Sequence, residues 1–164
     1  PRDHVPSILD HGLHCASSRT KDPNFIVIGK QDLVTARGSR RVPIPPDGTL
    51  ADFVPFYFAP RTPMLHNIQT GQGVQKRKKS EIVFIVTSLP KLAKHGVRYV
   101  FTDRHAYLHL ANFSSSVEDL QRLPWARAVS VCGNALRQAA PSRCLCQLTA
   151  GPSSPLLPTR TSRV

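Results

Sequence analysis

The residues able to act as nucleophiles, acids or bases show few of the spacings that catalysis needs. No serine stands in a GxSxG setting, and the sequence has no GxGxxG or GxxxxGK[ST] loop. Common hydrolase, dinucleotide and P-loop motifs are therefore excluded. The two glutamates are Glu81, at the start of an apolar run, and Glu118, in an expected first helical turn. These positions favour structural roles for both.

The metal-ligating residue types are scattered. The sequence has seven histidines and four cysteines, and the cysteines are Cys15, Cys132, Cys144 and Cys146. Their spacing matches neither a CxxC redox pair nor a paired zinc knuckle. We therefore expect free thiols and no metal.

Charge and length suggest the partner class and the domain number. The 164 residues include 22 Lys and Arg against 10 Asp and Glu, which gives a net charge of +12. Such a charge attracts polyanions, so nucleic acid is the leading partner class, although a merely solvated basic face gives the same count. The length and the 40% hydrophobic content suit one domain.

The sequence has no apolar window long enough to span a membrane, and its first thirty residues lack the features of a secretory signal. We expect a cytoplasmic protein without a membrane partner. The first residue is Pro1 rather than Met, so the N-terminus is expected to be incomplete.

Short elements of both kinds are expected to form an α+β domain. Apolar, β-branched runs predict strands at 25–29, 81–88 and 97–103, and an edge or bulged strand at 54–60, where Pro55 removes a ladder donor. Helical spacing and end signals predict helices at 5–13, 89–96 and 114–123. Ser7 and Ser116 are the expected N-caps of the first and last helix, and Gly12 is the expected stop of the first.

Residue usage changes near Trp125. There is no acidic residue after Asp119, no lysine after Lys94 and no isoleucine after Ile85. We therefore expect a domain over 1–125. The basic tail at 126–164, which contains Pro, Ser, Arg and Cys, is expected to be disordered or translated in a different reading frame.

One stretch, "VPIPPDGTLADFVPFYFAPRTPML" at 42–65, is similar to the signature of the DarT family. Similar pieces follow the family order: "VPSILDHGL", "VIGKQDLVTAR", "EIVFIVTSLPKL" and "VFTDRHA". The resemblance covers residues 2 to about 125. It implies an ADP-ribosyltransferase-like α+β fold of short, mainly antiparallel strands with flanking short helices.

DarT proteins are toxins that transfer ADP-ribose from NAD to thymine in single-stranded DNA, and a macrodomain antitoxin (DarG-like) removes the modification. The resemblance implies that Arg37 lies near the NAD phosphates and the reacting centre, and that Tyr57 lines the NAD pocket. Without the motif, Arg37 would be taken as a solvated loop arginine and Tyr57 as a core tyrosine. The resemblance also implies catalytic roles for Arg37 and His105, with His105 facing the target thymine. Together with the basic run at 76–79, it assigns the DNA side to Arg61, Met64, Lys78 and His105.

The family also uses a glutamate in its C-terminal third, and the corresponding region here reads "LRQAAPSRCLCQL". A gap-free count places Cys146 near that position, and residues 120–164 contain no acid. A thiol of ordinary pKa is mostly neutral at pH 7 and replaces a carboxylate poorly. We therefore expect impaired transferase activity. Two alternatives remain open: a non-catalytic nucleic-acid-binding remnant, or a translation product without function.

Overall fold

The computed structural model describes residues 1–59, 62–123, 125 and 147–150, and its helices and strands are short. The strands are β1 (Val54–Tyr57), β2 (Tyr99–Thr102), β3 (Phe113–Ser114) and β4 (Gln147–Ala150). The α-helices are α1 (Val5–His11), α2 (Gln31–Ser39), α3 (Pro63–Thr70) and α4 (Leu89–Lys94). Single 3₁₀ turns or helices are η1 (Arg2–His4), η2 (Leu50–Asp52), η3 (Lys79–Glu81) and η4 (Val117–Arg122). This is the expected mixture of α and β elements.

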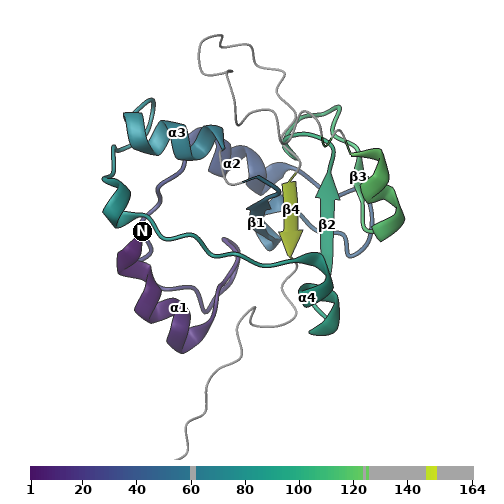
Figure 1. Cartoon of the computed structure of the whole chain (residues 1–164), viewed down its shortest axis with the longest axis horizontal. Coiled ribbons are helices and arrows are strands. Elements are labelled where there is room, and N and C mark those ends of the chain that lie inside the picture. The colour runs from purple at the N-terminus through teal and green to yellow at the C-terminus, as the bar shows by residue number, and fades with distance from the viewer. Residues whose placement is uncertain (60–61, 124, 126–146, 151–164) are drawn as a thin grey trace, which may run out of the picture.

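The four described strands form one sheet in the order β1-β4-β2-β3, and every neighbouring pair is antiparallel (Figure 1). The strand β1 lies at an edge of this sheet. Because Pro55 cannot donate a ladder hydrogen bond, an edge is the position that its strand tolerates. The prediction of an edge strand here is confirmed.

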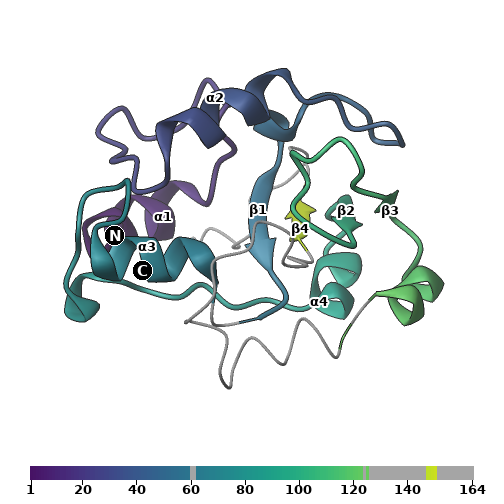
Figure 2. The same ribbon diagram turned by 90° about the horizontal axis from the view of Figure 1, so that it is seen from above.

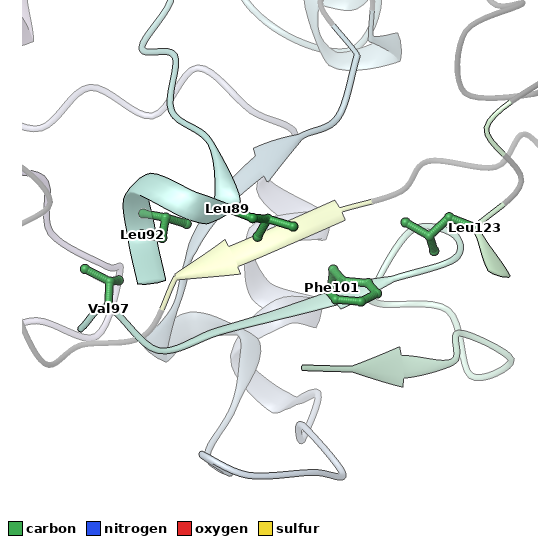
Figure 3. Packing of buried hydrophobic residues seen from close by; sticks show 5 residues of the cluster. All are labelled: Leu89, Leu92, Val97, Phe101 and Leu123. Atoms are coloured by element: carbon green, nitrogen blue, oxygen red, sulfur yellow. The ribbon is translucent and has the colours of Figure 1, made fainter. Parts of the chain in front are cut away.

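The sheet has an apolar cluster on each face. Successive strand residues point to opposite faces, so the neighbours Val100 and Phe101 of β2 enter different clusters. The cluster under α4 consists of Leu89, Leu92, Val97, Phe101 and Leu123 (Figure 3). The cluster on the other face consists of Val42, Leu50, Phe53, Val100 and Ala106. Figure 2 shows α2 and α4 on opposite sides of the sheet.

The helix ends follow local rules in part. Gly12 has a φ of 88° at the end of α1, a conformation that glycine adopts without strain, so the predicted stop is confirmed. Ser7 does not cap this helix, because α1 begins at Val5 directly after η1. The unexpected helix α3 has a clear cap, since the Thr62 hydroxyl accepts a hydrogen bond from the Leu65 amide at 3.1 Å.

Two strand predictions were wrong, and one helix differs in type. Residues 25–29 and 81–88 contain no strand. Their β-branched composition predicts an extended backbone, but a strand also needs a neighbour, and no described strand pairs with either run. The helix expected at 114–123 is the 3₁₀ helix η4. The Ser116 hydroxyl bonds the Glu118 carboxylate instead of capping a backbone amide.

Part of the segment set apart as a tail belongs to the sheet. Its residues Gln147–Ala150 form β4, which pairs with β1 on one side and with β2 on the other. The rest of 126–164 lies outside the described residues, so the expected boundary at 125 stays a prediction. None of the described helices is long and apolar enough to cross a bilayer.

The contrast between Leu92 and Leu9 tests the core under α4. Leu92 is 3% exposed in that core, whereas Leu9 is 62% exposed on α1. We expect Leu92→Ala to lower the free energy of unfolding by about 2–5 kcal/mol and Leu9→Ala by less than about 0.5 kcal/mol. Urea denaturation followed by circular dichroism measures both. Equal losses would show that α4 does not pack on the sheet as described.

Candidate active site

Arg37 is held in place by the buried turn that follows α2 in the fold. It lies in the last turn of α2, and its Nη2 donates to the Leu50 carbonyl at 2.8 Å. Leu50 is fully buried in the core and belongs to η2. The Asp52 carboxylate accepts from the Thr49 amide at 2.7 Å and so closes this turn. The guanidinium is therefore attached to a rigid part of the backbone.

Tyr57 ends β1 beside the start of α3. Its hydroxyl donates to the Met64 sulfur at 3.9 Å, which is a weak hydrogen bond. Met64 lies in the first turn of α3, where Pro63 and the Thr62 cap fix the backbone. The strand end and the helix start thus bring Tyr57 and Met64 together.

His105 is carried by the loop between β2 and β3. Its carbonyl accepts from the Leu108 amide at 3.0 Å in a tight turn, and its ring meets the Tyr107 ring edge-on at 4.6 Å. At the base of the loop, the Asp103 carboxylate accepts from the Asn112 amide at 3.0 Å and from the Asn112 side chain at 2.9 Å. These bonds fix both ends of the loop.

Arg40 ties this loop to the end of α2. Its Nη2 donates to the carbonyls of Leu108 and His109 at 3.2 and 3.3 Å, and its guanidinium lies 5.8 Å from the centre of the Phe113 ring. The elements that carry Arg37 and His105 are therefore joined directly by Arg40.

Arg37 lies close enough to Tyr57 and to His105 for its charge to change the pKa of both side chains. Burial raises the pKa of Tyr57, and the positive charge of Arg37 partly offsets this rise. Burial lowers the pKa of Arg37, which is opposed by Tyr57. Burial and the Arg37 charge lower the pKa of His105 to about 4, so its ring is neutral at pH 7.

Two buried nitrogens at this site have no hydrogen-bond partner among the described residues. They are Nη1 of Arg37 and Nδ1 of His105. An unpaired buried polar atom costs about 1–3 kcal/mol, so such atoms in a structured site favour a polar ligand that satisfies them. The guanidinium suits an anion such as phosphate, and a neutral imidazole can donate one hydrogen bond and accept another.

Of the other predicted site residues, Met64 contacts Tyr57 as described above, whereas Lys78 lies apart from the group. Lys78 is exposed ahead of η3, where its amide donates to the Glu81 carboxylate at 2.7 Å. It shares no hydrogen bond with Arg37, Tyr57 or His105. Arg61 and Cys146 lie outside the described residues.

Strand pairing places position 147 beside Tyr57, one of the site residues. In the register of β4, Gln147 is opposite Tyr57 of β1 and Thr102 of β2. The gap-free count from the family motif reached Cys146 and not Gln147, because such a count cannot give a strand register.

Two residues whose contacts position the site, Arg40 and Asp103, were not predicted from the sequence. Arg40 is surrounded by other basic residues, and no local pattern marks it as a tether. Asp103 had a usable signal, because an Asp directly after a strand often accepts hydrogen bonds from the loop that follows. Among the described residues, no group of three or more His, Cys, Asp or Glu side chains could hold a metal ion.

The lowered pKa of His105 predicts a specific loss of stability in acid. An unfolded histidine titrates near pH 6.5, whereas folded His105 does so at about 4. Between these values the unfolded chain binds more protons at this residue. Its contribution to stability is therefore complete above pH 6.5 and falls by about 1.4 kcal/mol per pH unit in acid.

Urea unfolding at pH 7 and pH 5 tests this expectation with His105→Gln as the reference. The unmodified chain should lose about 2 kcal/mol more than the variant over this interval. An equal pH dependence of the two proteins would contradict a buried, neutral His105.

Known proteins similar to this chain agree on one family. The family model described as "ssDNA thymidine ADP-ribosyltransferase, DarT" matches residues 1–138. A DNA ADP-ribosyl transferase of Escherichia coli O127:H6 (strain E2348/69 / EPEC) is 45% identical over 125 residues, which are 76% of this chain and 57% of that protein. A protein of the same name from Thermus sp. (strain 2.9) is 37% identical over 123 residues, 75% of this chain and 58% of that protein. The chain thus spans a little over half the length of these curated relatives.

Solved structures give the same result. Thermus sp. 2.9 DarT in complex with ADP-ribosylated ssDNA has a TM-score of 0.81 and 30% sequence identity, covering 93% of this chain and 72% of that chain. The same protein in complex with NAD+ has a TM-score of 0.75 and 29% identity, with the same coverage. These matches confirm the ADP-ribosyltransferase-like α+β fold. With a family model that matches most of its length, the chain belongs to the DarT family of DNA ADP-ribosyltransferases.

Proposed function

We propose that this chain is a DNA ADP-ribosyltransferase toxin of a toxin–antitoxin system, and that its activity is impaired. The observation that carries the proposal is the convergence of Arg37, Tyr57 and His105, with an unpartnered buried nitrogen on Arg37 and another on His105. These three residues come from α2, β1 and the loop after β2, so only the fold brings them together.

The proposed substrates are NAD and a thymine of single-stranded DNA. Structures of the Thermus sp. 2.9 relative hold NAD+ in one case and ADP-ribosylated ssDNA in another. Both substrates carry phosphates and flat rings, which suit cations and aromatic faces. The described part of this chain offers both types of group at the site, and the +12 charge favours either substrate.

The residues have distinct proposed roles. During transfer, the bond between ribose and nicotinamide breaks, a thymine nitrogen forms the new bond to the ribose carbon, and that nitrogen loses its proton. Arg37 binds the NAD phosphates through its free Nη1, and the Tyr57 ring packs against the bound nucleotide. His105 is neutral at pH 7 and faces the thymine, where it can exchange hydrogen bonds with the base.

The impairment follows from the charge of the site. Ribose becomes positively charged when nicotinamide leaves, and a nearby carboxylate would stabilise this charge and take the acceptor proton. No carboxylate contributes to the pKa shifts of Arg37 and His105, and residues 120–164 contain no acid. The site therefore supplies cations for binding without the anion that the reaction requires.

A second function is supported by the basic surface. Lys76, Lys78 and Lys79 are exposed in the run that precedes the 82–87 segment. Exposed lysines in a row can contact a DNA backbone whether or not the chemistry proceeds. A nucleic-acid-binding protein without turnover is the alternative.

We further propose a cytoplasmic location and a macrodomain antitoxin as the partner.

Restoring a carboxylate at position 147 should restore activity. In the register of β4, Gln147 pairs with Tyr57 of β1 and with Thr102 of β2. We expect Gln147→Glu to raise ADP-ribose transfer about 10²-fold or more, which is the typical effect of one charge-stabilising group. Intact-mass analysis of a thymine-containing single-stranded oligonucleotide, incubated with NAD and each protein, measures the product.

Cys146→Glu is the matched variant, since it adds the same charge one residue earlier. Rescue by this variant alone would contradict the register of β4, and strong activity of the unmodified chain would contradict the impairment. If neither variant nor the unmodified chain modifies DNA, the transferase proposal fails and the DNA-binding alternative remains.

The salt dependence of binding tests the DNA side. We expect Lys78→Ala to reduce the slope of log K against log salt by about 0.7 for a single-stranded oligonucleotide, the value for one phosphate contact. Fluorescence anisotropy at several salt concentrations measures the slope. Lys91→Ala removes an exposed lysine of α4 and serves as the control. Equal effects of the two variants would show that DNA binding depends on the net charge of the chain and not on the position of Lys78.

A further inference from the structure

The segment at 82–87 exposes apolar side chains in an unusual way. The exposed fractions are 47% for Val83, 59% for Phe84, 38% for Ile85 and 84% for Val86. Figure 2 shows this segment as a plain trace that runs from the α3 side of the molecule to α4. Four consecutive large apolar residues in water are unfavourable and mark an interaction surface.

The backbone of this segment is also unpaired. Its two ends are anchored, because the Ile82 amide donates to the Lys79 carbonyl at 3.2 Å and the Ser88 carbonyl accepts from the Leu92 amide at 3.0 Å. Between them, no hydrogen bond joins the backbone of residues 83–87 to another described residue. The flanking φ and ψ angles are extended, −105° and 126° at Ile82 and −140° and 154° at Ser88.

These two properties together define what can cover the segment. Successive side chains of an extended chain point to opposite faces, so exposure of all four means that both faces are apolar. Such a run is typical of an interior strand, which has neighbours in the sheet and cover on both faces. A lipid surface would cover the side chains but leave the amide and carbonyl groups unsatisfied. A polypeptide strand satisfies both needs.

We propose that residues 82–87 are a docking edge for a β-strand. This strand comes from polypeptide of the kind that the relatives carry outside the part they share with this chain. This chain covers 57% of the E. coli relative and 58% of the Thermus sp. relative, so each has a substantial further part. A second copy of this chain fits less well, because it would bring together two chains that each carry a net charge of +12. The proposal does not depend on the enzymatic chemistry.

Hydrogen–deuterium exchange of the full chain tests the docking edge. The probes are overlapping synthetic peptides that cover the residues of the E. coli relative without a counterpart in this chain. We expect at least one peptide to slow exchange of the 83–87 amides about 10-fold or more, since a paired strand protects its amides. Exchange in α4 should stay unchanged.

Ile85→Asp should abolish this protection, because it places a charge in the middle of the apolar run. Leu9→Asp is the matched control on α1, where Leu9 is also exposed, and it should retain the protection. Three results would overturn the proposal. They are protection of the 83–87 amides in the isolated chain at every dilution, protection that grows with the chain's own concentration, and no protection by any of the peptides.

Discussion

The hydrogen bond from Arg37 to the Leu50 carbonyl links the chemistry of the site to the core. A guanidinium loses hydration when it is partly buried, and it needs an acceptor that cannot move away. Leu50 supplies one, because its side chain is fully buried and its turn is closed by Asp52. The bond uses Nη2 only, so Nη1 keeps its capacity to bind a ligand. Core packing therefore fixes both the place and the direction of the positive charge.

The rest of the site follows the same principle with a different anchor. His105 lies on a loop whose base is closed by Asp103 and whose turn is held by Arg40. Burial and the neighbouring Arg37 keep its ring uncharged at pH 7. The positive charge of the site therefore comes from Arg37 alone among these three residues. Such an arrangement suits an anionic ligand, such as the phosphates of the proposed substrates.

Local signals in the sequence predicted the elements that depend on local chemistry. The stop of α1 at Gly12, the helix α4 and the edge position of β1 were predicted because glycine and proline act on their own backbone. The helix α2 was missed because it has no buried residue and hence no apolar stripe. The wrong strands at 25–29 and 81–88 show the converse, since a composition does not specify a pairing partner.

The candidate site was harder to predict from local sequence signals than the fold. Arg37, Tyr57 and His105 were identified only through the family resemblance, since each taken alone has an ordinary structural role. Their proximity depends on contacts between distant segments, such as the bonds from Arg40 to a loop 68 and 69 residues later. The pairing of position 147 with Tyr57 and Thr102 depends on the register of β4, and no spacing in the sequence contains that information.

The place of β4 has a consequence for synthesis of the protein on the ribosome. The sheet order puts the last described strand between β1 and β2, which are complete by residue 102. As the chain emerges, β1 must wait for Gln147–Ala150 before it gains a neighbour, and until then β2 has only the two-residue strand β3 beside it. Contacts this far apart in sequence form slowly, and unpaired edges attract other chains in the meantime. The nascent chain therefore exposes unpaired strand edges while the residues between 102 and 147 are made.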